Sequence, residues 1–279
     1  MATVAANFLN WIGRKVEARD ILRSQPSRLM QATLDLEPSL ADGDKLPPLW
    51  HWLYFLEAKR ASELGRDAHP IKGSFLPPVS LPRRMWAGGR LEFHAPLILG
   101  QDTLKRSIIK NVVEKNGRSG KLCFVTVEHT IYQGDQLALS EEQDIVYRED
   151  PAPGELKPQP VSAPDNPEFS QIIEPTQVML FRYSALTFNG HRIHYDVDYA
   201  RDIEGYEGLV FHGPLTATLL VNLASKQMGK VPSCFEYRAL TPISGMKPFH
   251  VEGRADGESL AVWALRHDGA LAMSATAFY

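Results

Sequence analysis

Residues 183–214 gather most of the side chains in this sequence that could carry chemistry. The stretch holds three histidines, His191, His194 and His212, together with Asn189 and several carboxylates. An imidazole titrates near neutral pH, so it can accept and return a proton during a reaction. The stretch is therefore the first candidate for a functional site. Metal binding, nucleophilic hydrolysis, acid–base chemistry and a purely structural role all compete to explain it.

Metal binding and nucleophilic hydrolysis explain the stretch poorly. The helical zinc signature places two histidines four residues apart, whereas His191 and His194 are closer and follow Gly190, which disfavours a helix. A nucleophilic serine often stands in a Gly-x-Ser-x-Gly turn, and no such turn surrounds Ser184 or Thr187. We therefore expect no metal ion here, while a structural role for any one histidine stays open.

Acid–base chemistry beside a helix terminus uses several of these groups together. Pro214 is typical of the first position of a helix, which places the amides of Gly213 and Leu215 at the helix start. Pro214 itself has no amide hydrogen. Free amides at a helix start, aided by the helix dipole, can stabilise the oxyanion of an enolate. We therefore predict an anion-stabilising site at Gly213 and Leu215, next to the histidines.

The surrounding sequence indicates which elements would position these groups. Residues 214–228 are mostly apolar and are closed by Gly229, which predicts a buried helix. Elsewhere apolar and polar residues alternate with a period of two between glycine-bearing turns, which predicts antiparallel strands. A buried helix wrapped by a curved antiparallel sheet is the hot-dog arrangement, an α+β fold.

The two halves of the chain repeat one pattern of runs and turns. In the first half the run 91–97 is followed by a run at 122–132, a turn at Gly134 and a run at 137–140. In the second half the matching features are 235–243, 260–265, Gly269 and 271–274. Such internal similarity predicts a double hot-dog, with two copies in tandem.

A proline-rich stretch separates the two halves. It predicts a linker at 150–168, between a degenerate, pocket-shaping hot-dog domain at 1–149 and a catalytic hot-dog domain at 169–279. Leu49–Leu64 is expected to form the helix of the first half, although its aromatic residues make it bulkier. Ser27–Leu40 is the expected counterpart of the histidine stretch and has no histidine. Chemistry is therefore expected in the second half.

Composition excludes several kinds of partner. Lys and Arg total 30 against 33 Asp and Glu, so the net charge of -3 gives no general attraction to nucleic acid or an anionic membrane. No apolar run approaches the roughly 18 residues of a membrane helix. Two cysteines without a disulfide framework, and a start without an export or transit signal, predict a cytoplasmic protein.

Residues 186–200 resemble the hydratase 2 motif of MaoC-like and R-specific enoyl-CoA hydratases, in which Thr-Gly-Asp-x-Asn-Pro-x-His is followed by an alanine. Residues 210–219 look like the helix entry of that family, with its His-Gly pair. The run Leu-Thr-Phe-Asn-Gly-His-Arg-Ile-His-Tyr-Asp and the segment 76–89 are more similar still to the hydroxyacyl-thioester dehydratase type 2 family. Within it they resemble the bacterial branch of mesaconyl-C4-CoA and itaconyl-CoA hydratases, over the whole chain.

The resemblance implies that His194 is the catalytic histidine, which takes a proton from water as the water adds to a conjugated double bond. No metal or redox cofactor is required for this. Asn189 stands where the motif has its Asp, and His191-Arg192 stands where the motif has Asn-Pro. An amide cannot accept a proton as a carboxylate does, so Asn189 is expected to orient water or substrate.

The resemblance also implies a substrate, a short dicarboxylic enoyl-CoA that is hydrated to citramalyl-CoA. Its free carboxylate calls for an arginine near the acyl end. The candidate substrate contacts are His191, His212, Arg83, Arg84, Arg192 and Arg238. Dehydration of a 3-hydroxyacyl thioester in fatty-acid synthesis, a hot-dog thioesterase and a non-catalytic acyl-CoA binder stay open as alternatives. A double hot-dog can act as a monomer, and a homodimer also stays open.

Overall fold

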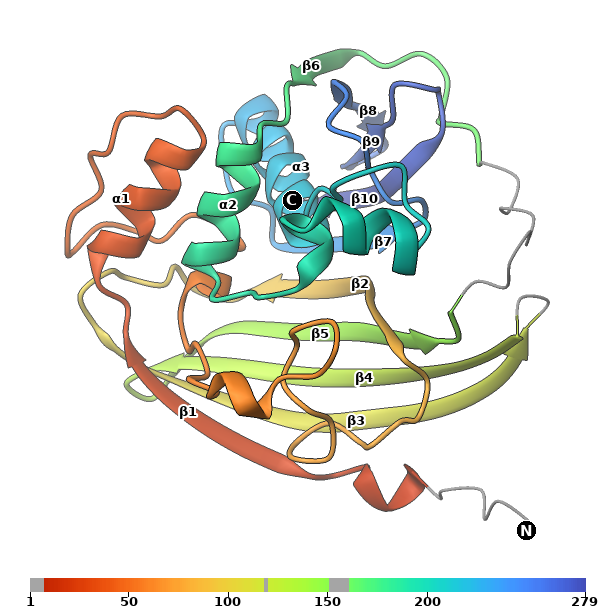
Figure 1. The fold of residues 1–279 in the computed structure, drawn as a ribbon. Coiled ribbons are helices and arrows are strands. Elements are labelled where there is room, and N and C mark those ends of the chain that lie inside the picture. The colour runs from red at the N-terminus through yellow and green to blue at the C-terminus, as the bar shows by residue number, and fades with distance from the viewer. Residues whose placement is uncertain (1–7, 118–119, 151–160) are drawn as a thin grey trace, which may run out of the picture.

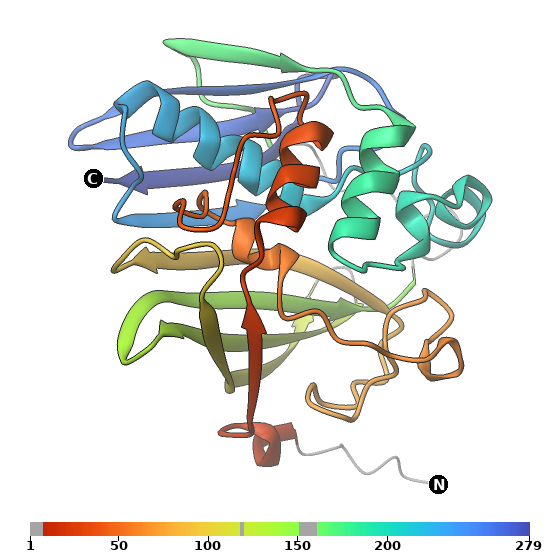
Figure 2. The ribbon, with the colours of Figure 1, turned by 90° about the vertical axis from the view of Figure 1, so that its left-hand side faces the viewer.

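The computed structural model describes residues 8–117, 120–150 and 161–279, in which one antiparallel sheet carries helices on its inner face (Figure 2). The strands are β1 Lys15–Ile21, β2 Arg83–Phe93, β3 Asp102–Gly117, β4 Gly120–Gln133, β5 Gln136–Arg148, β6 Phe169–Ile173, β7 Cys234–Ala239, β8 Phe249–Asp256, β9 Ser259–Leu265 and β10 Leu271–Phe278. The α-helices are α1 Ser24–Thr33, α2 Gln177–Leu186 and α3 Gly213–Met228. Short helical turns are η1 Phe8–Trp11, η2 Trp50–Leu53, η3 Ala61–Glu63, η4 Arg192–His194 and η5 Tyr199–Ile203.

The order of the strands repeats on either side of a central seam (Figure 1). It reads β1-β3-β4-β5-β2-β7-β10-β9-β8-β6, so that β2 matches β7 and β5 matches β10. The seam pairs β2 with β7 antiparallel, from Gly88 opposite Arg238 to Glu92 opposite Cys234. The predicted double hot-dog is confirmed, because the sheet consists of two copies of one strand order joined edge to edge.

Helix α3 forms where the sequence predicts it and fills the inner face of the second half. It begins beside Pro214 and ends at Gly229, which takes a left-handed φ of 67°. Leu215, Leu220 and Val221 are fully buried in the core cluster that includes residues of β8, β9 and β10. Burying one such side chain stabilises the fold by about 1.5–3 kcal/mol. The helix start is thus fixed in place from behind by the core.

The described residues of the first half form no helix of this kind, and the prediction of a helix over Leu49–Leu64 is wrong. Only the short turns η2 and η3 form there. Leu49 and Phe55 take positive φ values of 67° and 58°, which no helix tolerates. Loops therefore cover the inner face of β2–β5 (Figure 2). Helix α1, which overlaps the predicted counterpart Ser27–Leu40, packs against α2, the helix that leads into the histidine stretch.

The predicted linker at 150–168 falls mostly on residues 151–160, which lie outside the described residues. The domain boundaries 1–149 and 169–279 therefore stay a prediction. Within the described ranges, no helix is long and apolar enough to cross a membrane.

Candidate active site

A cavity of about 1280 Å³ between the two halves brings together many of the predicted site residues. Asn189, His191, His194 and Gly213 line it from the second half, and Arg84 lines it from the first. A cavity of this size is large enough for a cofactor-sized ligand. Residues of both halves therefore line one cavity.

His194 is held in one orientation and in one protonation state. It lies at the end of η4, is buried, and its Nδ1 lies 2.8 Å from the carbonyl oxygen of Val210. Because a carbonyl only accepts, Nδ1 carries the hydrogen and Nε2 keeps its lone pair. Burial lowers the His194 pKa to about 4, against the opposing effect of the Val210 hydrogen bond. His194 is thus neutral at pH 7 and can accept a proton at Nε2.

His212 supports His194 from behind instead of facing the cavity. Its ring stacks on the His194 ring with 3.6 Å between centroids, and its Nε2 lies 2.8 Å from the Ser184 hydroxyl on α2. The side chain is fully buried and is not part of the cavity wall. Burial, with a contribution from His194, holds the His212 pKa well below its ordinary value. His212, predicted as a substrate contact, therefore lies behind the His194 ring and outside the cavity wall.

The start of α3 presents a free amide to the cavity at Gly213. The first intrahelical bond of the helix runs from the Thr216 amide to the His212 carbonyl, and no partner of the Gly213 amide is present among the described residues. A Cβ added at Gly213 would meet no atom within 4 Å, so the space before it is open. Leu215 is fully buried in the core and does not line the cavity, whereas Thr216 does.

Asn189 shapes the turn that leads from α2 to His194. Its backbone N–H donates to the Ser184 carbonyl at 2.8 Å, and its side-chain Oδ1 accepts from the backbone N–H of His191 at 3.0 Å. Phe188, immediately before it, takes a φ of 48°. An aspartate would accept the same bond from His191, so the exchange of a carboxylate for an amide changes the charge of the site and not the turn.

Arg83 and Arg84 are neighbours on β2 in different surroundings. Arg83 is buried and paired, since its Nε donates to Glu204 at 2.7 Å and its Nη2 donates to the Tyr206 hydroxyl at 2.8 Å. It does not line the cavity. Arg84 lines the cavity, is half-buried and forms no ion pair with any described residue.

The other two predicted arginines also differ from each other. Arg192 donates to Asp196 from both Nε and Nη2, at 3.0 and 2.7 Å, and its guanidinium lies 4.2 Å from the centre of the Tyr199 ring. It holds the turn beyond His194 and does not line the cavity. Arg238 lines the cavity from β7 and is largely exposed to solvent.

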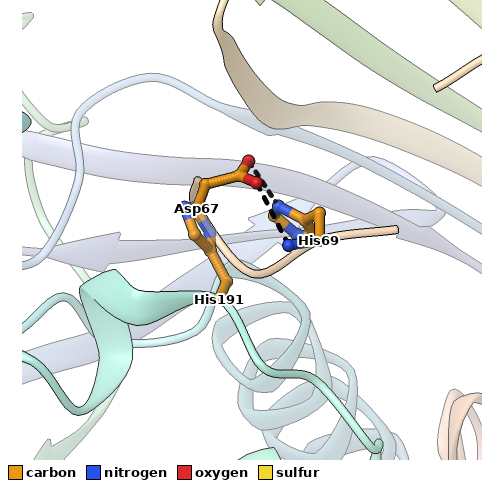
Figure 3. A group of neighbouring side chains, drawn as sticks. All are labelled: Asp67, His69 and His191. Atoms are coloured by element: carbon orange, nitrogen blue, oxygen red, sulfur yellow. Dashed lines mark hydrogen bonds and ion pairs between the residues drawn. The ribbon is translucent and has the colours of Figure 1, made fainter. Parts of the chain in front are cut away.

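Asp67 and His69 belong to the site and were missed by sequence reasoning. They lie in the loop before β2, where Asp67 Oδ2 accepts from His69 Nδ1 at 2.9 Å (Figure 3). The His69 ring lies 4.2 Å from that of His191, which in turn lies 5.5 Å from that of His194. The Asp67 carbonyl accepts from the Arg192 amide at 3.1 Å, which joins the loop to the histidine stretch.

The electrostatics of this group follow from burial and from Arg84. Burial lowers the pKa of His69, and the Arg84 charge lowers it further. Burial also lowers the His191 pKa, with further contributions from His69 and His194. Burial alone would raise the Asp67 pKa, but the hydrogen bond and charge of His69 outweigh it and lower that pKa. The site therefore holds neutral imidazoles beside one ionised carboxylate and the guanidinium of Arg84, which has no ion-pair partner among the described residues.

Asp67, His69 and His191 also have the donor types of a metal site. One ligand atom from each lies within 4.8 Å of the others, a spacing that an ion could bridge after small movements. Two features oppose a cation there. Asp67 is already hydrogen-bonded to His69. The Arg84 charge acts on both imidazoles, and it would repel a second positive charge.

A second buried polar group closes the cavity on the side of the first half. His51 Nε2 lies 2.9 Å from Glu141 Oε2, and the Trp52 indole donates to Glu141 Oε1 at 3.0 Å. Burial would raise the Glu141 pKa, but the hydrogen bond and charge of His51 lower it to about 2. The ionised Glu141 thus attaches η2 to β5, in the place where the second half has its helix.

Comparison with known proteins places the chain among thioester hydro-lyases. Residues 49–245 match the family model described as hydroxyacyl-thioester dehydratase type 2. The chain is 44% identical to the mesaconyl-C(4)-CoA hydratase of Chloroflexus aurantiacus over 98% of both chains. It is 31% identical to the mitochondrial hydroxyacyl-thioester dehydratase type 2 of Schizosaccharomyces pombe, over 85% of this chain and 89% of that protein.

Solved structures share the fold at low sequence identity. A MaoC-like dehydratase from Phytophthora capsici superposes with a TM-score of 0.71 at 12% identity, over 96% of this chain and 95% of that chain. HtdX of Mycobacterium tuberculosis superposes with a TM-score of 0.67 at 16% identity, over 94% of this chain and 98% of that chain. These structures bear on the fold alone.

Proposed function

Because the chain belongs to the hydroxyacyl-thioester dehydratase type 2 family, we propose that it is a hydro-lyase that adds water to the double bond of a short dicarboxylic enoyl-CoA. The proposed reaction converts mesaconyl-C4-CoA or itaconyl-CoA to citramalyl-CoA. Among the relatives, the 44% identity to a mesaconyl-C(4)-CoA hydratase favours this substrate class over a fatty enoyl chain.

The observation that carries the reaction type is a neutral, oriented imidazole next to a free helix-terminal amide. In the proposed hydration of mesaconyl-C4-CoA, whose double bond is conjugated with the thioester, His194 Nε2 takes a proton from water while the water oxygen bonds to the β carbon. The electron pair of the double bond moves toward the thioester oxygen, where the Gly213 amide stabilises the developing negative charge. The protonated His194 then returns its proton to the α carbon, so atoms and charge balance.

Dehydration of a 3-hydroxyacyl thioester is the reverse of the same steps and is the second candidate. The name of the fission-yeast relative, hydroxyacyl-thioester dehydratase type 2, favours it. A thioesterase or a silent acyl-CoA binder would use the same cavity differently, and the amide at Asn189 is the feature that keeps these two readings open.

One assay separates these functions. Purified protein is offered mesaconyl-C4-CoA, itaconyl-CoA and crotonyl-CoA in parallel, and free CoA is measured for all three. The absorbance of the conjugated enoyl thioester is followed for mesaconyl-C4-CoA and crotonyl-CoA, and chromatography of the citramalyl-CoA product is used for itaconyl-CoA, whose double bond is not conjugated with its thioester. Loss of the absorbance without CoA release, fastest for a dicarboxylic thioester, is the expected result. A preference for crotonyl-CoA would contradict the substrate class, and release of CoA would indicate a thioesterase.

We further propose an acyl-CoA-dependent enzyme of the cytoplasm that requires no metal or redox cofactor. The free Cys123 and Cys234 suit a reducing compartment. The proton transfer and the oxyanion site described above use only the groups of the chain. A homodimer remains open, and the molecular mass in solution would decide it.

A further inference from the structure

Within the described part of the chain, the imidazole of His194 has no free carboxylate beside it. His194 donates Nδ1–H to a backbone carbonyl, and Asn189 offers an amide where the related motif has an aspartate. An imidazolium formed during catalysis in so buried a place is stabilised by a nearby negative charge. The carboxylate of Asp67 is hydrogen-bonded to His69 and is not part of the cavity wall. A negative charge that could stabilise the imidazolium of His194 must therefore come from a ligand.

The same end of the cavity carries an unpaired cation. Arg84 is half-buried in the cavity wall and has no ion-pair partner in the described chain, whereas its neighbour Arg83 forms an ion pair with Glu204. A partly desolvated guanidinium is stabilised best by a carboxylate that binds it through two hydrogen bonds. His69 and His191 line the cavity with it, and the Arg84 charge acts on both rings. The ionised Asp67 in this corner is hydrogen-bonded to His69 and is not part of the cavity wall, so the groups that face a ligand are the Arg84 cation and the two neutral imidazoles, which suit an anion.

We propose that the substrate's own carboxylate, on the β carbon of the enoyl thioester, binds at Arg84, His69 and His191. There it supplies the negative charge that Asn189 lacks. The inference rests on the proposed hydratase function. A carboxylate on the β carbon reaches this corner while that carbon faces His194, because the His191 and His194 rings are only 5.5 Å apart. It then lies beside the imidazolium that His194 becomes.

The same arrangement explains why position 189 holds an asparagine and not an aspartate. An aspartate at this position would place a second negative charge close to the substrate carboxylate, and the repulsion would weaken binding. An asparagine keeps the hydrogen bond to the His191 amide and removes the charge. The amide is therefore a specificity determinant: it admits a charged acyl group and depends on that group to complete the site.

The decisive experiment exchanges the charge at position 189 and measures two substrates. Wild type and Asn189→Asp are assayed with mesaconyl-C4-CoA, which has the β-carboxylate, and with crotonyl-CoA, which has a methyl group instead. We expect kcat/KM of the variant to fall about 100-fold for the first and to rise about 10-fold for the second. Because Asp accepts the same turn hydrogen bond, the variant keeps the fold, and a melting curve checks this. Equal losses on both substrates would overturn the proposal.

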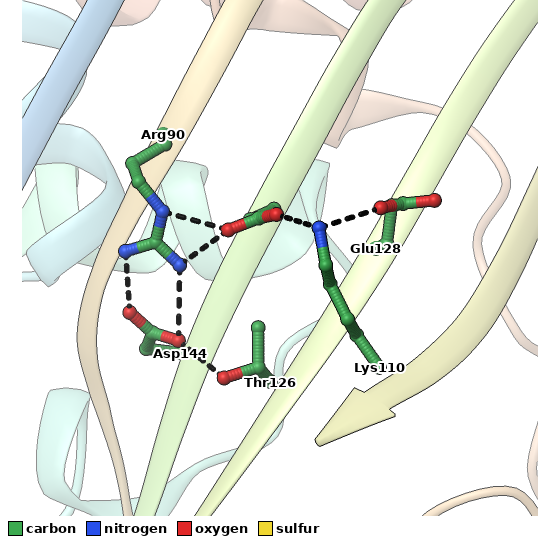
Figure 4. A network of polar contacts seen from close by, with 6 residues as sticks. Arg90, Lys110, Thr126, Glu128 and Asp144 are labelled. Carbon is green, nitrogen blue, oxygen red and sulfur yellow. Dashed lines mark hydrogen bonds and ion pairs between the residues drawn. The ribbon is translucent and has the colours of Figure 1, made fainter. Parts of the chain in front are cut away.

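Arg84→Met tests the cation. We expect about a 100-fold loss with mesaconyl-C4-CoA, mostly in KM, and a much smaller loss with crotonyl-CoA, with partial recovery in Arg84→Lys. Arg90→Met is the matched control on the same strand. Arg90 lies in a paired network away from the cavity, with Glu142 at 2.7 Å and Asp144 at 2.9 Å (Figure 4). A similar loss for both substrates in Arg84→Met would overturn the assignment.

Binding without turnover separates this proposal from the hydratase function. Calorimetry compares methylsuccinyl-CoA, with its thioester at C4, and butyryl-CoA in two buffers of different ionisation enthalpy. A bound carboxylate raises the pKa of His69 or His191, which otherwise face Arg84, Asp67 and each other. We therefore expect proton uptake for methylsuccinyl-CoA alone, reduced in Arg84→Met. Equal binding of both thioesters without uptake would overturn the carboxylate site.

The outcomes of the two proposals are distinct. A wild-type protein that hydrates no enoyl-CoA but binds methylsuccinyl-CoA more tightly, with proton uptake, would refute the hydratase and retain the carboxylate site. Hydration that Asn189→Asp and Arg84→Met impair equally for both substrates would retain the hydratase and refute the carboxylate site. Activity abolished by EDTA and restored by Zn²⁺ would assign Asp67, His69 and His191 to a metal and overturn the inference.

Discussion

The two halves of the sheet share one strand order but cover their inner faces differently. The second half fills its face with α3, whose apolar side chains are fully buried. Among its described residues the first half has only η2 and loops at the matching place, and these line the cavity together with residues of the second half. The helix that remains supplies the Gly213 amide, and the helix that is missing leaves room for a ligand. The duplicated sheet thus carries one asymmetric site, because a central helix covers only one of its two halves.

The buried polar groups of the two halves, His194 in the second and Glu141 in the first, also differ in their charge and hydrogen bonding. In the second half His194 is neutral, and its Nδ1 hydrogen-bonds to a backbone carbonyl, which carries no formal charge. A proton that binds to this ring therefore adds a new charge to the site. In the first half Glu141 is ionised and already satisfied by His51 and Trp52. The first arrangement suits proton transfer, and the second suits attachment of η2 to the sheet. Substitutions in the two groups should therefore have different readouts.

The largest effect is expected for His194→Ala. Removal of the base should lower kcat by about 1000-fold, within the range for general acid–base groups, while the melting temperature changes little by comparison. Enoyl-thioester absorbance measures the rate. His250→Ala is the matched control, because His250 on β8 is 41% exposed and lies outside the cavity wall. Near-normal turnover in a folded His194→Ala variant would refute the assignment of the base.

Much of this second-half site was open to prediction from the sequence. The helix start, its proline and the histidines lie within one short stretch, so local rules suffice, and the position of α3 is confirmed. Asp67 and His69 carry no such signal, since only the folding of a distant loop against His191 gives them meaning. A helix was predicted over Leu49–Leu64 because the apolar residues of this run suit a helix. Its backbone instead turns at Leu49 and Phe55, and Trp50 and Tyr54 are buried without one.

Glu141→Gln tests whether the buried polar group of the first half has a structural role. Glutamine replaces a buried, ionised acceptor of the His51 and Trp52 hydrogen bonds with a neutral group, and the free energy of unfolding should fall by about 1.5–3 kcal/mol. Urea denaturation measures the loss. Glu17→Gln is the surface control, because its pair with Arg106 is 2.7 Å long but more than half exposed on both sides, and about 0–1 kcal/mol is expected there. Equal losses in both variants would remove the contrast between the pairs.

A smaller effect is expected for Ser184→Ala, which acts through His212. Ser184 provides the hydrogen bond at His212 Nε2, and the Nδ1 of that ring already has no partner in the described chain. Loss of the bond leaves the ring unsatisfied and should cost about 1–3 kcal/mol of stability. Because His212 stacks on His194, kcat should fall by several-fold as well. Ser225→Ala is the control, since the buried Ser225 hydroxyl has no partner among described residues, and unchanged stability in both variants would contradict the role of Ser184.

The smallest effect is expected on mild acidification, and it reports on burial of the base. A histidine with a pKa near 6.5 would be about three-quarters protonated at pH 6, with a matching loss of rate. The His194 pKa is lowered to about 4, so kcat/KM should change less than about twofold between pH 7.5 and pH 6. Stability should nonetheless decline as the pH falls from about 6.5 toward about 4, because the unfolded chain takes up the proton there and the folded chain does not. A rate profile with an acid limb at pH 6.5 would mean that His194 is solvated when it acts, and the contrast between a buried base in the second half and a ligand-accommodating first half would then be lost.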